Sequence, residues 1–213
     1  MTYDREQFFF DFRQNFGPLV QTQVDGLNFI LGRAESDANW QNLSQLAYGL
    51  ATVKWETAHH FVPVTEFGKR EYFKRYDPGA ASGQALGNTE PGDGYLFRGR
   101  GYVQITGRAN YERIGRLLNI DLIGEPWRAL DPETAYRIFS DGMTHGWFTG
   151  KKLSDYIASD QEAHFESARA IINGLDHAAD IAAIARSMRT ILQACPAVLT
   201  VPDNVTVEKR EEI

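Results

Sequence analysis

The sequence contains a single cysteine, Cys195, among its 213 residues. A disulfide needs two cysteines, and a cysteine-based zinc site needs at least that many, so neither can form within this chain. Disulfide-free chains suit a reducing compartment. We therefore expect synthesis in the cytoplasm.

Long hydrophobic runs are also missing. The first residues, MTYDREQ, lack the basic region and apolar stretch of a signal peptide, and no apolar run approaches the roughly 20 residues that cross a bilayer. We expect a protein without a signal peptide or a membrane partner. Such a protein would reach an extracellular target only after membrane permeabilisation.

Basic residues are in deficit, with 22 Lys and Arg against 28 Asp and Glu, a net charge of -6. Phosphate backbones are bound by clustered Lys and Arg, so this balance argues against a nucleic-acid partner. One stretch is locally basic: residues 97–113 hold four arginines and one acidic residue, Glu112.

The length and the 43% hydrophobic content are ample for one buried core. We expect a single domain over residues 1–213, a monomer, and a loose tail at 202–213.

Apolar residues recur mostly at helical spacing, and no alternating strand of useful length is visible. The predicted fold class is mainly α, with at most a short β-hairpin around 95–105. Helices are predicted over 4–31 with a break at Gly17-Pro18, and over 42–60, 109–118, 131–145, 162–172 and 178–194.

The segment from 63 to 101 lacks periodicity and is dense in glycine and proline. Loops of this length inside a compact domain are usually functional or disordered, and the interleaved aromatic residues favour order. We interpret the segment as one wall of a cleft.

Two carboxylates are candidates for catalysis. Glu56 borders the apolar stripe of the 42–60 helix, and Gly49, on the same face, predicts open space beside it. Glu66 follows ten positions later, beyond Pro63, and can turn back toward the helix. Inverting glycosidases place two carboxyl groups roughly 6.5 to 9.5 Å apart. Taken singly, each glutamate also fits the pattern of an ordinary surface residue. Glu66 also fits that of an ion-pair partner for a nearby cation.

A metal site is a weaker alternative. His59 and His60 follow Glu56 closely, but a zinc protease motif needs His where Trp55 stands. Histidines near the last carbonyls of a helix explain the pattern better. We expect no metal and no cofactor.

Residues 97–111 combine three glycines with the short polar side chains of Gln104, Thr106 and Asn110. Glycines allow a ligand to approach the backbone, and amide and hydroxyl groups hold water or acetamido groups. The segment has no phosphate-loop pattern, so a nucleotide is not expected.

These residues make the chain recognisable: it resembles glycoside hydrolase family 19, the chitinase and lysozyme-like group, and especially its phage-type endolysins. The Gly-Arg-Gly to Ala-Asn-Tyr block within 98–111 is the most specific part. The resemblance is carried by residues 46–59, 63–68, 87–95, 98–111 and 168–174.

The resemblance implies a lysozyme-like fold with two lobes and a central cleft, and an inverting mechanism without a cofactor. It implies that Glu56 is the general acid, Glu66 the general base, and Thr106 the residue that orients water. It assigns Gln104, Asn110 and Asn173 to substrate binding, and Arg100, Tyr111 and Arg169 to the support of the cleft and its carboxylates. The family often has His before the acid, where this chain has Trp55.

Three functions remain open at this point. The first is a peptidoglycan hydrolase that cuts between N-acetylmuramic acid and N-acetylglucosamine. The second is a chitinase, which would use the same residues on a polymer of N-acetylglucosamine. The third is a sugar-binding module that keeps the fold without activity. A cell-wall glycan is the expected partner in each case.

Overall fold

The computed structural model describes residues 2–196, so the tail predicted at 202–213 lies outside the described part of the chain. The fold is mainly α, as predicted. The longer helices are α1 (Arg5–Phe16), α2 (Gln21–Ala34), α3 (Leu43–Glu56), α7 (Arg108–Leu118), α8 (Pro132–His145) and α10 (Ala178–Ala194). The short ones are α4 (Arg70–Phe73), α5 (Ala81–Ala85), α6 (Asp93–Leu96) and α9 (Leu153–Tyr156), with the 3-10 turns η1 (Lys74–Tyr76), η2 (Pro126–Leu130) and η3 (Ser167–Ile171).

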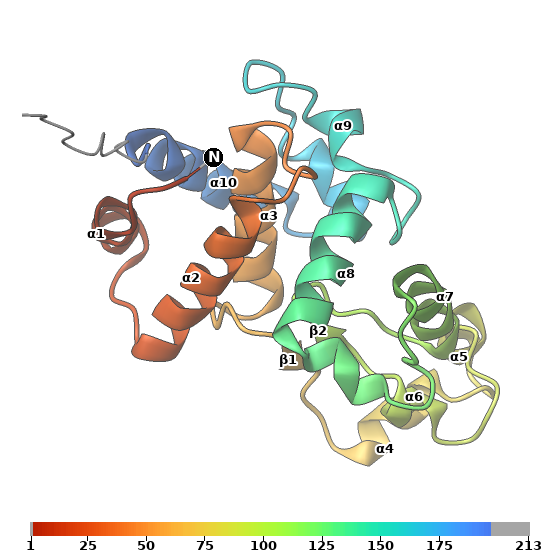
Figure 1. Cartoon of the computed structure of the whole chain (residues 1–213). Coiled ribbons are helices and arrows are strands. Elements are labelled where there is room, and N and C mark those ends of the chain that lie inside the picture. Colours follow the sequence, from red (N-terminus) through yellow and green to blue (C-terminus); the bar gives the residue numbers. More distant parts are fainter. Residues whose placement is uncertain (1, 197–213) are drawn as a thin grey trace, which may run out of the picture.

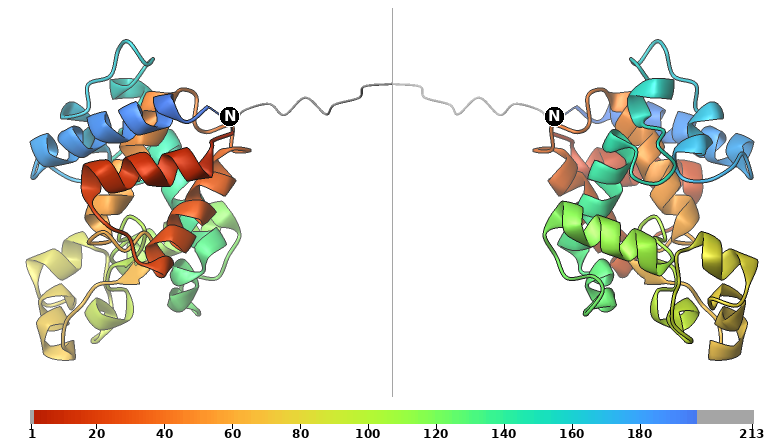
Figure 2. Two further views of the ribbon diagram at one scale, coloured as in Figure 1. Left: turned by 90° about the vertical axis from the view of Figure 1, so that its left-hand side faces the viewer. Right: turned by 90° about the vertical axis from the view of Figure 1, so that its right-hand side faces the viewer.

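The helices form two lobes (Figure 1). The first lobe holds α1, α2, α3, α9 and α10, and the second holds α4, α5, α6 and α7. Strands β1 (Val64–Thr65) and β2 (Arg100–Gly101) lie at the junction, and α8 runs from one lobe toward the other. The side views in Figure 2 show the same separation. None of the helices within 2–196 has the length and apolar character needed to cross a membrane.

Helix α3 is the centre of the first lobe, where α10 packs along it. Asn42 caps its start by accepting a hydrogen bond from the Gln45 backbone N–H at 3.0 Å, and every residue from 44 to 54 is buried. A helix buried all round is a core element, so its end is positioned by packing on every side.

The predicted 42–60 helix ends four residues early, at Glu56. Ala58, His59 and Phe61 adopt positive φ angles of 47°, 70° and 57°, and the His59 N–H bonds back to the Lys54 carbonyl at 2.8 Å. This left-handed turn closes the helix and leaves Glu56 at its C-terminal end.

Gly49 does not open a pocket, contrary to the expectation from sequence. A Cβ atom there would lie 2.7 Å from the Trp40 ring and 2.9 Å from the Phe139 ring. The glycine instead lets two aromatic side chains pack directly against the α3 backbone.

The predicted helix at 162–172 is also wrong, because only the 3-10 turn η3 forms there. The chain before it makes a β-bridge between Ile157 and Ala163, and the His164 N–H bonds to the Tyr156 carbonyl at 2.8 Å. These extended contacts occupy the residues that would have started the helix.

The hairpin prediction was partly correct. Arg100 and Ile105 form a bridge within the predicted range. Strand β2 also pairs antiparallel with β1, which was not predicted, in the register Val64 to Gly101 and Thr65 to Arg100. This pairing joins the residues just before Glu66 to the glycine-rich block.

The predicted long loop at 63–101 is ordered, but it is built from short helices. Two glycines let them pack closely. A Cβ at Gly83 would lie 2.0 Å from the Asp77 carbonyl oxygen, and one at Gly94 would lie 2.2 Å from the Phe73 carbonyl oxygen. The second lobe is therefore held by backbone contacts that larger residues would prevent.

Candidate active site

Glu56 lies at the end of α3 and contacts Arg169 from η3. Arg169 Nη1 donates to Glu56 Oε1 at 2.5 Å, and the two side chains are 5% and 17% exposed. Arg169 Nε also donates to the Asp176 carbonyl at 3.1 Å. The arginine is thus fixed at two points, and it fixes the carboxyl group through one oxygen.

Trp55, which precedes Glu56, packs against a histidine from another part of the chain. Its ring centroid lies 4.8 Å from that of His177, the residue before α10, with an interplanar angle of 39°. An imidazole is therefore present beside this position, although it does not come from the preceding residue.

Glu66 directly follows β1 and is held by backbone groups. Its N–H donates to the Gly99 carbonyl at 2.7 Å, and its Oε2 accepts from the Gly99 N–H at 3.1 Å. Tyr76 donates its hydroxyl to Glu66 Oε1 at 3.4 Å. A Cβ at Gly99 would lie 3.2 Å from Glu66 Oε2 and 2.8 Å from Gln104 Oε1. A side chain at position 99 would therefore displace the Gln104 amide.

Gln104, Thr106 and Asn110 form a chain of hydrogen bonds after β2. The Gln104 amide donates to the carbonyls of Val64 and Gly101, both at 2.9 Å. Thr106 donates its hydroxyl to the Gln104 carbonyl at 3.0 Å, and the Asn110 amide donates to the Thr106 carbonyl at 2.8 Å. Each side chain is oriented by a backbone carbonyl, which leaves its oxygen as an acceptor.

These three side chains line a pocket of about 550 Å³ together with Asn173. The structure therefore brings Asn173 next to three residues that precede it by more than 60 positions. Its wall also contains Tyr76, the partner of Glu66, and Asn173 closely follows Arg169, the partner of Glu56. The remaining lining residues are Ser82, Ala85, Leu86, Val103, Ile105, Ile114, Phe148 and Ile172.

The pocket lies between the two lobes, since its lining comes from the second lobe on one side and from residues 148 and 172–173 on the other. An apolar wall with a few polar groups is the usual composition of a ligand site. The two glutamates are not part of this lining, but each contacts a residue linked to it. Glu66 accepts from Tyr76 of the lining, and Glu56 contacts Arg169, whose carbonyl accepts from the Asn173 N–H at 3.1 Å.

Arg100 and Tyr111 are buried, 5% and 0% exposed, and lie behind the glycine-rich block. Arg100 Nη1 donates to the Tyr111 hydroxyl at 2.9 Å and to the Leu96 carbonyl at 2.8 Å. The Tyr111 hydroxyl donates to the Arg98 carbonyl at 2.8 Å. Burial raises the pKa of Tyr111 to about 12, although Arg100 acts in the opposite direction. The hydroxyl therefore remains a neutral donor that supports the block.

No protein-family model matches the chain, and no curated protein matches it. Solved structures do match it, among them two of chitinase C. Chitinase C from Streptomyces griseus HUT6037 aligns with a TM-score of 0.57 and 18% identity, over 91% of this chain and 95% of that one. A chitinase C mutant with one glutamate replaced by glutamine aligns at 0.58 and 19%, over the same shares.

The chain has the fold of chitinase C. The predicted lysozyme-like fold class is thereby confirmed. The likeness extends over nearly the whole of both chains, so no large part of the chitinase C fold is missing here. At this identity the likeness concerns the fold alone, and it does not distinguish phage-type relatives from others.

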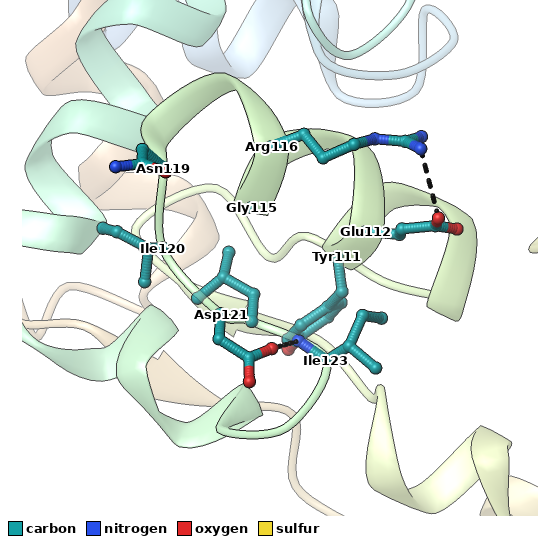
Figure 3. A pocket seen from close by; sticks show the side chains of 9 residues that line it. Tyr111, Glu112, Gly115, Arg116, Asn119, Ile120, Asp121 and Ile123 are labelled. Atoms are coloured by element: carbon teal, nitrogen blue, oxygen red, sulfur yellow. Dashed lines mark hydrogen bonds and ion pairs between the residues drawn. The ribbon is translucent and has the colours of Figure 1, made fainter.

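A second pocket, of about 360 Å³, lies at the end of α7 (Figure 3). Its two carboxylates are engaged. Glu112 pairs with Arg116 at 3.2 Å, and Asp121 accepts from the Ile123 N–H at 3.1 Å. Tyr111 also contributes to this pocket, whereas Glu56 and Glu66 do not. We assign no chemistry to it.

The locally basic stretch at 97–113 is not a free cationic surface. Arg98 donates to the Tyr95 carbonyl at 2.6 Å, Arg100 is buried, and Arg108 pairs with Asp93 at 2.6 Å. Arg113 donates to Asn110 and to the Trp147 carbonyl. These arginines hold the block in place.

Tyr76 and Gly99 were not predicted as site residues. Tyr76 lies in the segment interpreted as a cleft wall, and its aromatic neighbours indicated order without indicating a partner for Glu66. Gly99 belongs to the glycine-rich block at 98–111. Its role depends on the side chains of Glu66 and Gln104, which come together only in the folded protein.

Proposed function

We propose that this chain is a glycoside hydrolase that cuts peptidoglycan between N-acetylmuramic acid and N-acetylglucosamine, with inversion at the anomeric carbon. One observation carries the proposal. In a fold shared with chitinase C, Glu56 is held by Arg169 and Glu66 by Gly99, and both are linked to a pocket between the lobes that carries a few polar side chains.

In this mechanism Glu56 donates its proton to the glycosidic oxygen as the bond to the anomeric carbon breaks. Arg169 contacts only Oε1 of Glu56, which leaves Oε2 to carry the proton. Glu66 accepts a proton from a water molecule that attacks the opposite face of the sugar, and Thr106 orients this water. The products are two shorter strands, one with a new reducing end.

The amide groups of Gln104, Asn110 and Asn173 are suited to the acetamido substituents of the sugars, since an amide both donates and accepts hydrogen bonds. Arg100 and Tyr111 act indirectly, by supporting the block that carries Gln104 and Thr106. Glu56, Glu66 and Thr106 would contact the reacting atoms.

A chitinase is the second candidate, because the similar solved structures are of chitinase C. Both polymers offer an acetamido sugar at the cleavage point. Measuring the release of reducing ends from murein sacculi and from chitin oligomers, with mass analysis of the products, separates the two. Anhydromuramyl products would indicate a lytic transglycosylase and contradict hydrolysis. Binding of glycan without cleavage of either polymer would leave the non-catalytic module.

Replacing Glu66 with glutamine is expected to lower kcat about 100-fold, because the amide cannot accept the proton of the attacking water. Gln still accepts from the Gly99 N–H, so the fold should persist. Initial rates of reducing-end release measure the effect, and added azide, which needs no base, should restore part of the turnover.

The matched control is Glu112→Gln, which removes an exposed carboxylate of α7 from the same lobe and should leave the rate unchanged. Full activity of Glu66→Gln would show that Glu66 is not the base. Glu71, Glu90 and Asp93 would then be the residues to test.

A further inference from the structure

The segment that follows Glu66 carries exposed aromatic side chains. Phe67, adjacent to the proposed base, is fully exposed at 100%, and Tyr72 is 43% exposed. An exposed aromatic ring beside the site presents a flat apolar face to a ligand. Four cations, Lys69, Arg70, Lys74 and Arg75, are exposed on the same segment. We call these four the basic rim.

The basic rim makes no ion pair with any residue between 2 and 196. The segment 69–75 has four basic residues and one acidic residue, a net charge of +3, in a chain whose net charge is -6. Of the other thirteen arginines between residues 2 and 196, seven form an ion pair with a carboxylate. A concentration of unpaired positive charge on an acidic protein indicates an anionic partner.

The rim is connected to the site. The Arg75 guanidinium lies over the rings of Tyr72 and Tyr76, 3.7 Å and 4.7 Å from their centroids, and Arg75 Nη2 donates to the Tyr76 hydroxyl at 2.7 Å. Tyr76 in turn donates to Glu66 and lines the pocket. A ligand on the rim therefore lies beside the proposed base.

The chemistry of the rim selects among glycans. Aromatic faces such as Phe67 pack against the apolar faces of sugar rings whatever their charge, whereas Lys and Arg bind carboxylates. Chitin is uncharged. A peptidoglycan strand carries carboxylates on its lactyl groups and stem peptides. Nucleic acid is a poorer fit, because its dense phosphate charge is bound by extended basic surfaces, whereas this chain has a net charge of -6.

We propose that the basic rim binds the carboxylates of an anionic glycan strand and that Phe67 stacks on its sugars. This inference rests on the proposed function, since it names the substrate class of the same site. The rim gives preference for peptidoglycan over chitin, and Phe67 gives affinity for both.

Replacing Phe67 with alanine is expected to weaken binding to charged and neutral glycans alike, by about 5- to 10-fold, as expected for an aromatic contact. The Tm should not change, because a fully exposed side chain contributes no burial to the folded state. Phe10→Ala, which removes an exposed phenylalanine from α1, is the control. Equal binding by Phe67→Ala and Phe10→Ala would exclude the stacking role.

The decisive experiment measures binding rather than turnover, with Glu56→Gln as the background so that the polymer stays intact. The rim variant carries Lys69→Gln, Arg70→Gln and Lys74→Gln. The control variant carries Arg13→Gln, Lys151→Gln and Arg186→Gln, which remove equal charge from exposed positions on other elements. Each is cosedimented with murein sacculi, with sacculi whose carboxylates have been amidated, and with chitin.

The rim variant should bind sacculi about 10-fold more weakly than the control at low salt, and equally at about 1 M salt, where the Debye length is about 3 Å. All proteins should bind amidated sacculi and chitin alike. The inference is overturned if the rim variant binds sacculi as well as the control does, or if amidation of the sacculi leaves binding by the Glu56→Gln parent unchanged. A protein that binds in this way but never cleaves would contradict the proposed function and leave the inference intact.

Discussion

Replacing Glu56 with glutamine is expected to lower kcat by about 10⁴-fold, the upper end of what a general acid contributes. Glutamine has the shape of glutamate, and its Oε1 still accepts from Arg169, so the end of α3 should be undisturbed. The amide has no proton to give to the glycosidic oxygen. Glycan binding should therefore persist while bond cleavage stops.

The measurement is the initial rate of reducing-end release from sacculi and from chitin oligomers, with the Tm and the far-ultraviolet circular dichroism as tests of folding. Glu166→Gln is the matched control, because it removes an exposed carboxylate close to Arg169 in the chain. It should retain wild-type activity. If Glu56→Gln also keeps activity near the wild type, the assignment of the acid is wrong.

Replacing Asp93 with alanine is expected to reduce the free energy of unfolding by about 3 kcal/mol, the cost of breaking a buried ion pair. Asp93 is 2% exposed and accepts from Arg108 Nε and Nη2 at 2.7 Å and 2.6 Å. It also accepts from the backbone N–H groups of Thr89 and Glu90 at 2.9 Å and 3.0 Å. Alanine leaves a guanidinium and two amides without partners.

Urea unfolding measures this loss, and Glu90→Ala, an exposed neighbour, should change stability little. The second lobe carries Thr106 and Asn110. The activity of the variant should therefore fall only at urea concentrations at which it begins to unfold. An unfolding free energy within about 0.5 kcal/mol of the wild type, the usual range for a surface substitution, would contradict the structural role of Asp93.

The same carboxylate gives a pH dependence. Burial acts to raise the pKa of Asp93, but hydrogen bonds from Arg108 and from two backbone amides outweigh it and lower the pKa below the ordinary 3.8. A lowered folded-state pKa adds stability above the unfolded value and loses it as the pH falls through the folded one. The wild type should lose this contribution to its free energy of unfolding below about pH 4, whereas Asp93→Asn should lack the contribution at every pH. Parallel stability curves for the two proteins would contradict this assignment.

The helices could be predicted because periodicity and capping residues agree. The start predicted at residue 42 is where Asn42 caps α3, and the helix predicted over 131–145 forms as α8 with Pro132 in its first turn. The end of α3 could not be predicted, since its left-handed turn is made by Ala58, His59 and Phe61, which carry no turn signal. The residues around η3 have helical spacing, but the bridge of Ile157 with Ala163 prevents the helix.

The sequence predicted which residues form the candidate site better than it predicted the contacts between them. The resemblance named Glu56 and Arg169, yet they are 113 positions apart, and spacing alone gives no reason for them to meet. The arginines of the glycine-rich block looked like a basic surface, whereas the structure engages them internally. Which charged side chains form ion pairs depends on the whole fold. The sequence therefore gives the number of charged residues but does not show which of them stay unpaired.

Inversion is the feature that distinguishes the proposed roles of Glu56 and Glu66 on a β-linked acetamido-sugar polymer. Proton NMR of a freshly started digest measures it, because the anomeric signals are read before mutarotation mixes them. We expect the new reducing ends to appear first as the α-anomer. Reducing ends that appear first as the β-anomer, or anhydro products without reducing ends, would contradict it.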